Sequence, residues 1–304
     1  MKNHLYSFDI SSHIHRAYHS TLKNKENEKP NAYFNGIPNY MIRPVMSLIQ
    51  SEINSMQETP HSHIVFVFDG RSETNFRKDL YPEYKANRSE TPEDLIIQKR
   101  IIYQMLKSMG YPILCIPEYE ADDIIGTLNK TTSQNGINHT IFTKDKDLFA
   151  LIGEHTNIYR GRKHGVYDTQ RVIDELGVKP SQVVDYLTFI GDTSDNIDGI
   201  PNIGPKSVPK VLKHLTLEQV LDNPSIIEDI NNIKNKTKII DYISNNKEKI
   251  LLMKKLVTMK DDIELNIKLS DLRKKEPDLE RVAQIEQKFG LSQETSYRAR
   301  QNKM

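Results

Sequence analysis

The sequence predicts an α/β fold built on a doubly wound, mostly parallel sheet, and two observations support this prediction. Short runs of apolar, β-forming residues alternate with longer stretches of helical periodicity in the first half of the chain. Some of these runs are apolar throughout, as expected of parallel strands that are covered on both faces. In such a sheet, ligands bind beyond the carboxyl ends of the strands.

The expected strands follow one another between residues 5 and 143. They lie at 5–10, 64–68, 111–116 and 138–143, with helical stretches at 96–109 and 121–130. This alternation indicates βαβ units. Residues 71–95 are polar, basic and aromatic, and they are too many for a tight connection, so we expect an excursion above the carboxyl edge of the sheet.

The chain is expected to change character near residue 179, where strand-like runs stop and helical patterns continue. We therefore divide it into a core at 1–178, a helical region at 179–265 with lysines gathered at 234–260, and a charged C-terminal helix and tail at 266–304. A length of 304 residues suits one large domain or two modest ones.

Composition narrows the setting of the protein. Cys115 is the only cysteine, which excludes an internal disulfide or a cysteine-based zinc site and favours a reducing cytoplasm. Its apolar neighbours favour a small buried hydrophobe over a reactive thiol. The first residues lack the apolar core of a signal peptide, and no apolar run is long enough to cross a membrane. We expect a soluble cytoplasmic protein with no membrane partner.

Nine acidic residues in five short clusters point to the chemistry. Such a gathering of carboxylates is costly unless cations lie between them. Hard divalent ions such as Mg²⁺ take oxygen ligands and share them with phosphate substrates. The sequence therefore predicts a metal-dependent enzyme acting on phosphodiesters, and its candidate ligands are Asp9, Asp69, Glu120, Asp122, Asp123, Asp145, Asp147, Asp192 and Asp195.

Each cluster also has an ordinary structural interpretation. The acids at 120–123 can complement a helix dipole, those at 145 and 147 can lie in a solvated turn, and those at 192 and 195 can form a cap or an Asx-turn. The joint occurrence of the clusters at one predicted sheet edge favours the functional interpretation. The net charge of +1 leaves a basic surface once these acids are neutralised, which is compatible with a polyanionic substrate.

A second kind of motif occupies residues 199–206. Gly199 and Gly204 bracket a tight turn, and the backbone N–H groups at the start of a following helix could hold a DNA phosphate. Lys206, Lys210 and Lys213 add positive charge. A plain turn between two helices is the alternative.

These motifs resemble the 5′-nuclease family, which includes the 5′→3′ exonuclease domain of bacterial DNA polymerase I and stand-alone flap endonucleases of bacteriophages. The resemblance rests, in chain order, on Asp9-Ile-Ser-Ser with Arg16-Ala-Tyr-His, Phe68-Asp-Gly, Phe76-Arg, Tyr84-Lys-Ala-Asn-Arg, Tyr119-Glu-Ala-Asp-Asp, Thr143-Lys-Asp-Lys-Asp-Leu, and 191–204. It spans residues 5–265, and we expect a free-standing member of the family.

The resemblance implies a PIN-like sheet with a helical arch at 71–110 and a helix–three-turn–helix DNA-binding motif at about 185–215. It implies two Mg²⁺ ions, replaceable by Mn²⁺, in a two-metal phosphodiester hydrolysis, and K⁺ at the helix–three-turn–helix motif. Asp9, Asp69, Glu120 and Asp122 would form the first metal group. The remaining five acids would form the second.

The resemblance also implies roles for the cations and the aromatic residue of the predicted arch. Lys85 and Arg88 would hold the scissile phosphate, and Tyr84 would offer a face on which a displaced base stacks. Arg16 and Arg77 would contact DNA. Two departures from the family pattern, Pro209 and Asp198, bear on the grip on duplex DNA. A helix that begins at Pro205 would be disturbed by Pro209, whereas one capped by Ser207 would hold it in the first turn.

The expected activity is structure-selective cleavage of branched, nicked or 5′-flapped DNA, as 5′→3′ exonuclease and flap endonuclease, in replication or repair. Partners would be this DNA and, as a protein partner, a DNA polymerase; we expect a monomer. One alternative is a nuclease that acts chiefly on RNA, as in the removal of RNA–DNA primers. Another is a catalytically silent protein that binds DNA structures, although every expected carboxylate is present.

Overall fold

The computed structural model describes residues 3–25, 33–56 and 62–291. A six-stranded sheet lies at its centre in the order β5-β4-β1-β6-β7-β8, and all neighbours are parallel except the pair of β7 and β8. β4 and β5 lie on one side of β1, and β6, β7 and β8 lie on the other, which is the doubly wound topology that the sequence predicts. The strands are β1 His4–Asp9, β4 Ser62–Val67, β5 Ile113–Leu114, β6 Asn138–Phe142, β7 Thr156–Tyr159 and β8 Val166–Tyr167.

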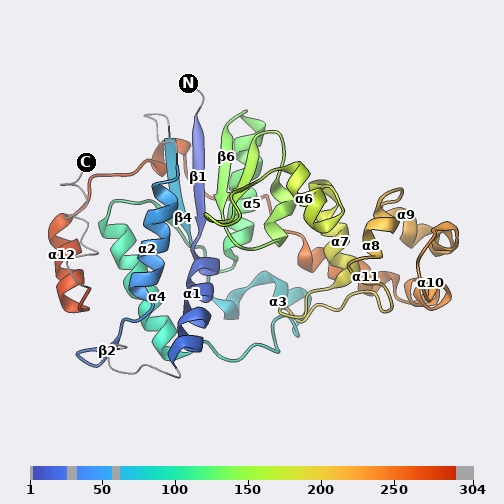
Figure 1. Cartoon of the computed structure of the whole chain (residues 1–304), viewed down its shortest axis with the longest axis horizontal. Helices are drawn as coiled ribbons and strands as arrows, with labels where there is room; N and C mark the ends of the chain where they lie inside the picture. Colours follow the sequence, from blue (N-terminus) through green and yellow to red (C-terminus); the bar gives the residue numbers. More distant parts are fainter. Residues whose placement is uncertain (1–2, 26–32, 57–61, 292–304) are drawn as a thin grey trace.

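Helices cover both faces of this sheet (Figure 1). Alternate residues of β4 point to opposite faces, so Val65 and Val67 pack into one core while Ile64 and Phe66 pack into the other. Helix α5 (Ala121–Gln134) covers the first face. The second is covered by α1 (Ile10–Lys25), α2 (Ile42–Ile53), α4 (Glu93–Ser108) and α12 (Leu279–Lys288).

The expected arch over residues 71–110 needs correction. Its first part holds a short 3₁₀ turn, Ser72–Thr74, and α3 (Phe76–Leu80), and residues 81–92 then cross below the sheet without regular structure (Figure 1). We call residues 81–92 the strap. Residues 93–108 form α4, which packs against the sheet through Ile102 and Leu106, both fully buried. Its apolar face makes α4 part of the core.

The chain from residue 169 to 291 contains helices and no strand, in line with the sequence. They are α6 Thr169–Leu176, α7 Val183–Ile190, α8 Val208–Leu212, α9 Leu217–Asp222, α10 Lys236–Asn245 and α11 Lys247–Val257, with 3₁₀ turns Pro180–Gln182, Pro224–Asp229 and Leu269–Leu272. After α11 the chain returns to the sheet, and α12 is the last helix of the described residues; the tail expected at 292–304 lies outside them.

Three smaller elements complete the fold. A hairpin of β2 (Tyr33–Phe34) and β3 (Ile37–Pro38) and a 3₁₀ turn at Asp147–Leu151 are not evident in the sequence pattern.

The segment around Cys115 differs from its expectation. Cys115 is exposed, so the expectation of a buried thiol is wrong. Only two residues of the expected 111–116 strand pair with β4. In the described part of the chain, no helix is both long and apolar enough to span a membrane.

Helix α8 resolves the alternatives for Pro209. The helix begins at Val208, after a turn in which the N–H groups of Ser207 and Val208 both donate to the Gly204 carbonyl oxygen, at 2.8 and 3.1 Å. Pro209 is then its second residue, where a missing N–H breaks no helical hydrogen bond. The later start is confirmed, but the Ser207 side chain forms no capping hydrogen bond.

Candidate active site

Two adjacent parallel strands deliver the first carboxylates to the carboxyl edge of the sheet. Asp9 ends β1, and Asp69 follows β4 by two residues. Only 2% of Asp9 is exposed; its Oδ1 accepts the Ser12 N–H at 3.0 Å and its Oδ2 accepts the Thr143 hydroxyl at 2.7 Å. These bonds fix the carboxylate between β1, α1 and the end of β6.

Asp69 is tied to α5. Its Oδ1 accepts the backbone N–H of Ala121, the first residue of that helix, at 2.9 Å. Burial on its own would raise the pKa of Asp69, but the Lys99 ammonium and the Ala121 N–H hold it below its usual range. Asp69 is therefore ionised at neutral pH, with the helix start directed at its charge.

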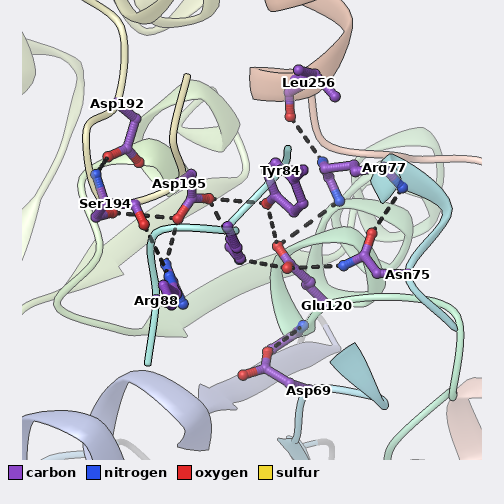
Figure 2. Close-up of polar contacts among 12 residues, drawn as sticks. Asp69, Asn75, Arg77, Tyr84, Arg88, Glu120, Asp192, Ser194, Asp195 and Leu256 are labelled. Atoms are coloured by element: carbon purple, nitrogen blue, oxygen red, sulfur yellow. Dashed lines mark hydrogen bonds and ion pairs between the residues drawn. The ribbon is translucent and has the colours of Figure 1, made fainter. Parts of the chain in front are cut away.

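Glu120 precedes the first turn of α5 and is shared among several donors. Its Oε1 accepts the Asn75 side-chain amide at 2.9 Å and the Lys85 ammonium, and its Oε2 accepts the Tyr84 hydroxyl at 3.0 Å (Figure 2). Glu120 thus connects the start of α5 to the α3–strap segment.

Asp122 and Asp123 lie in the first turn of α5, and the other four acids come from two loops. After β6, the N–H of Asp145 donates to the Thr143 hydroxyl at 3.0 Å, and the N–H of Asp147 donates to Asp145 Oδ1 at 2.9 Å. After α7, Asp192 and Ile197 exchange backbone hydrogen bonds of 2.9 and 2.8 Å, which closes a tight turn that carries Asp195. An open pocket lies at these loops, and its lining includes residues 144–147 together with Tyr186, Leu187, Ile190, Gly191 and Asp192.

Electrostatics indicates that eight of the nine predicted ligands form one group. Burial, with the charge of Asp69, raises the pKa of Asp9 to about 6. Burial and the charges of Asp145 and the first metal group raise the pKa of Asp122 well above its usual value. Burial and the negative charges of Asp145, Asp192 and Asp195 do the same for Asp147. Carboxylates that raise one another's pKa in this way lie within one field, which a divalent cation would relieve.

Asp123 does not belong to this group, and the expectation that it is a metal ligand is corrected. It is fully buried, and its two oxygens accept the two guanidinium nitrogens of Arg77, each at 2.7 Å. Oδ1 also accepts the Lys260 N–H at 2.8 Å. With these donors around it, Asp123 has no oxygen directed at the other acids.

The expectation that Arg77 contacts DNA is also corrected. Only 3% of it is exposed, and besides Asp123 it donates to the carbonyl oxygens of Leu256 at 2.8 Å and Thr258 at 3.2 Å, at the end of α11. A guanidinium enclosed in this way cannot reach DNA. It joins α3 to α5 through Asp123, and to the end of α11 through Leu256, which Figure 2 shows bonded to Arg77.

The strap is bonded to the turn at 192–197. The Lys85 N–H donates to the Asp195 carbonyl oxygen at 2.9 Å, and the Arg88 guanidinium donates to the Asp195 carboxylate and, at 3.0 Å, to the Ser194 carbonyl oxygen. The Lys85 ammonium lies 3.4 Å from Asp195 Oδ2. Lys85 also has φ +57°, a left-handed conformation that is strained for a residue with a Cβ. The fold therefore holds both cations against the acidic group.

Tyr84 has a different role from the one expected. Only 2% of it is exposed, and its hydroxyl bridges Glu120 and Asp195 (2.9 Å to the latter) while Arg77 and Lys85 lie over its ring. A ring enclosed in this way offers no face to a base, so the stacking role is wrong for this structure. Tyr84 orients two carboxylates instead.

The predicted DNA contacts are only partly available. Arg16, Lys206, Lys210 and Lys213 are all exposed, and Lys210 also donates to the Asn232 carbonyl oxygen at 2.9 Å. A Cβ on Gly204 would meet nothing within 4 Å, so a phosphate could approach its backbone.

Gly199 is a structural glycine. A Cβ there would lie 2.4 Å from the Ile190 carbonyl carbon, and one on Gly191 would lie 2.3 Å from the Gly199 nitrogen. The two glycines let the ends of the acidic turn cross in contact. The expected DNA role of Gly199 is replaced by this packing role.

The sequence analysis missed a buried pair behind Asp9. The His13 ring donates Nδ1–H to the Asp9 carbonyl oxygen at 2.5 Å, and its Nε2 lies 2.6 Å from the Glu52 carboxylate. Burial opposes charge on His13, yet Glu52 raises the pKa of His13 above its usual value. The second Glu52 oxygen faces the Lys144 ammonium at 3.8 Å. A histidine four residues after Asp9 was the only available signal.

The carboxylates lie close together, but their oxygens are not arranged as a set of metal ligands. Across residues 3–25, 33–56 and 62–291, no three His, Cys, Asp or Glu side chains converge as a ready metal site. Lys85 and Arg88 instead engage Glu120 and Asp195. The donor set consists of carboxylate oxygens, which suits hard divalent cations.

Comparison with known proteins agrees with this geometry. Residues 4–177 match the 5′-3′ exonuclease N-terminal resolvase-like domain, and residues 178–280 match the 5′-3′ exonuclease C-terminal SAM fold. A 5′-3′ exonuclease of Aquifex aeolicus is 32% identical over 282 residues, which cover 92% of this chain and 90% of the relative. The chain belongs to the 5′-3′ exonuclease family.

Two further similarities extend the comparison. DNA polymerase I of Streptococcus pneumoniae is 33% identical over 244 residues, which cover 78% of this chain but only 27% of the polymerase. The fold is similar to that of the T5 D15 protein co-crystallised with metal ions, with a TM-score of 0.63 at 21% identity, over 84% of this chain and 89% of that one.

Proposed function

We propose that the protein is a Mg²⁺-dependent, structure-selective 5′ nuclease that cleaves branched, nicked or 5′-flapped DNA as exonuclease and flap endonuclease. The observation that carries this proposal is the placement of eight carboxylates from five segments within one electrostatic field at the carboxyl edge of the sheet, with Lys85 and Arg88 held against them. Family membership supports the reaction class, and the structurally similar T5 5′-exonuclease with bound divalent zinc ions supports divalent ions.

The residues are suited to hold two ions. Asp9, Asp69, Glu120 and Asp122 would hold the first, and Asp145, Asp147, Asp192 and Asp195 the second; Mn²⁺ has the same oxygen preference. When bound, such a pair activates a water and stabilises the leaving oxygen of an in-line displacement. We propose K⁺ as a further ion near the Gly204 turn.

The other residues of the site bind and orient the substrate. Lys85 and Arg88 would move from carboxylate to phosphate and offset the charge that develops on the phosphate in the transition state. Tyr84 and Asn75 keep Glu120 in position while Lys85 leaves it. Arg16, Lys206 and Lys213 would contact the DNA backbone, which sets position without reading sequence.

A 5′-labelled flap substrate tests the proposal. With Mg²⁺ we expect a single product near the junction for flap cutting, together with a ladder of short products for exonuclease action. Asp145→Ala should retain flap binding in the absence of divalent metal and lose cleavage. Undiminished cleavage by the Asp145→Ala protein, or cleavage of an RNA flap only, would refute the proposal.

The relation to DNA polymerase I also suggests a partner. In the Streptococcus polymerase, a segment similar to this chain occupies about a quarter of the length. We propose that a separate DNA polymerase acts on the same DNA, which a pull-down with and without nicked DNA would examine.

A further inference from the structure

Two lysines alternate with two of the candidate metal ligands in the segment that follows β6. The residues are Thr143-Lys144-Asp145-Lys146-Asp147. An ammonium next to a pair of carboxylates competes with a metal ion for the same oxygens, because both are cations that carboxylates bind. Each lysine is instead paired with an acid outside the eight. Lys146 Nζ lies 2.8 Å from Glu175 Oε1, and Lys144 Nζ lies 3.8 Å from Glu52 Oε1.

These two ion pairs differ in their contact with solvent. The side chains of Lys146 and Glu175 are 54% and 26% exposed, so water and salt screen their attraction. Those of Lys144 and Glu52 are only 14% and 1% exposed. Screening is weak for such a pair, so the charge of Glu52 governs where the Lys144 ammonium lies.

Glu52 is itself fixed from the end of β1. It lies one residue before the end of α2, and its Oε2 is 2.6 Å from His13 Nε2. The other ring nitrogen of His13 donates to the Asp9 carbonyl oxygen at 2.5 Å. Oε1 accepts no hydrogen bond from any of the described residues, so the charge on this oxygen is directed at Lys144.

A glycine provides the space in which Glu52 and Lys144 meet. A Cβ on Gly161 would lie 2.2 Å from Lys144 Nζ and 3.7 Å from Glu52 Oε1, so a larger residue there would displace the ammonium. The backbone of Lys144 is also held, because its carbonyl oxygen accepts the Arg160 guanidinium at 2.9 Å. The fold therefore provides a defined position for the Lys144 side chain.

We propose that Glu52 is a positioning residue for the second group of metal ligands, which it serves by holding the Lys144 ammonium away from Asp145 and Asp147. This inference rests on the proposed nuclease function and extends it. Lys144 lines the same pocket as these two acids. An ammonium released from Glu52 would occupy their oxygens, and a metal ion would have to displace it.

The test is a Glu52→Gln variant compared with a Glu175→Gln control. Each change removes one negative charge from the partner of a lysine in the same segment, and only Glu52 is buried. A glutamine keeps an oxygen that can accept from His13. Mn²⁺ affinity of the whole chain is measured without DNA, by electron paramagnetic resonance of the free ion. Urea unfolding without metal checks that each variant folds.

We expect Glu52→Gln to weaken Mn²⁺ binding about ten-fold, as is typical when a residue that supports metal ligands is lost. Glu175→Gln should weaken it about two-fold or less, because its pair is exposed. In flap cleavage, the Mg²⁺ concentration for half-maximal rate should rise in Glu52→Gln by the same factor as the Mn²⁺ dissociation constant. KM for DNA and kcat at saturating Mg²⁺ should be unchanged, because excess metal displaces the ammonium.

Removing the ammonium should restore metal binding. Lys144→Met is expected to change Mn²⁺ affinity by about two-fold or less alone, and to raise it about five-fold or more in the Glu52→Gln protein, as coupled neighbours do. If Glu52→Gln does not fold, His13→Leu/Glu52→Leu replaces the whole buried pair by apolar side chains, which folded proteins tolerate. The same loss, and the same recovery by Lys144→Met, are expected there.

A Glu52→Gln protein that loses no more Mn²⁺ affinity than Glu175→Gln would overturn the inference while the nuclease function stands. A loss that Lys144→Met does not recover would also overturn it, because Glu52 would then act on Asp9 through His13 alone. An unchanged protein that neither binds Mn²⁺ nor cuts flap DNA would overturn both the inference and the nuclease function.

Discussion

Arg77 and Lys85 lie eight residues apart in one basic segment, yet the fold uses them in opposite ways. Arg77 is enclosed, with both guanidinium nitrogens on Asp123 and its remaining donors on the end of α11. Lys85 is partly open, with its ammonium shared between Glu120 and Asp195. A cation whose partners are all protein groups stabilises structure, whereas one held at an open acidic group is free to exchange partners with a substrate.

Breaking the enclosed pair should produce the largest effect. Arg77→Ala leaves Asp123 as a buried, unpaired charge, so the free energy of unfolding should fall by about 3–5 kcal/mol. Urea unfolding would measure the loss. Adding Asp123→Asn to Arg77→Ala should recover part of it, because the buried charge is then absent. A loss below about 1 kcal/mol would contradict the enclosed role of Arg77.

Removing Lys85 should act on turnover instead. Lys85→Ala is expected to lower kcat about 10²- to 10³-fold, with a smaller change in affinity, because the ammonium offsets charge in the transition state. Its free energy of unfolding should change less than in Arg77→Ala, since Tyr84 and Asn75 still bond Glu120. Equal losses in kcat and affinity would make Lys85 a docking cation only.

His139, a buried residue away from the site, should make the free energy of unfolding depend on pH. Burial, with the charge of His4, lowers the pKa of His139 to about 3, while the unfolded chain keeps its usual value of about 6.5. The unfolded state therefore takes up a proton first as pH falls below 6.5. The buried neutral His139 makes its full contribution to the free energy of unfolding above pH 6.5. Below pH 6.5 that contribution falls by up to about 1.4 kcal/mol per pH unit.

His139→Asn isolates that contribution. Neutral His139 lies 2.7 Å from the Ser7 hydroxyl and 3.2 Å from Asn129 Oδ1, and an amide can donate and accept in its place. Urea unfolding from pH 7 to 4.5 should show a flatter loss of stability in the variant. Parallel curves for the two proteins would exclude a buried neutral histidine.

The smallest effect is expected at an exposed pair. Lys249 lies 2.8 Å from Asp198, and both side chains are largely exposed. Lys249→Ala should change the free energy of unfolding by no more than about 1 kcal/mol and leave cleavage unaffected. A loss comparable to that of Arg77→Ala would show that enclosure is not what separates the two pairs.

The predictions made from sequence succeeded where information is local. Runs of alternating or continuous apolar residues identified β1, β4 and β6, and the acids at their carboxyl ends followed from strand direction. The short strands β7 and β8 gave no comparable signal, and the hairpin that joins them went unnoticed. α4 was assigned to an arch because the resemblance to the 5′-nuclease family implied one over residues 71–110, although the apolar face of α4 packs on the sheet.

The sequence by itself determined the doubly wound sheet and the positions of the acids on it, since periodicity and strand polarity are properties of neighbouring residues. The tertiary structure decided which charged groups close on one another. Arg77 meets Asp123 46 residues later, His13 meets Glu52 39 residues later, and Tyr84 meets Asp195 111 residues later. No local pattern specifies such partners, because burial and pairing depend on how distant segments pack.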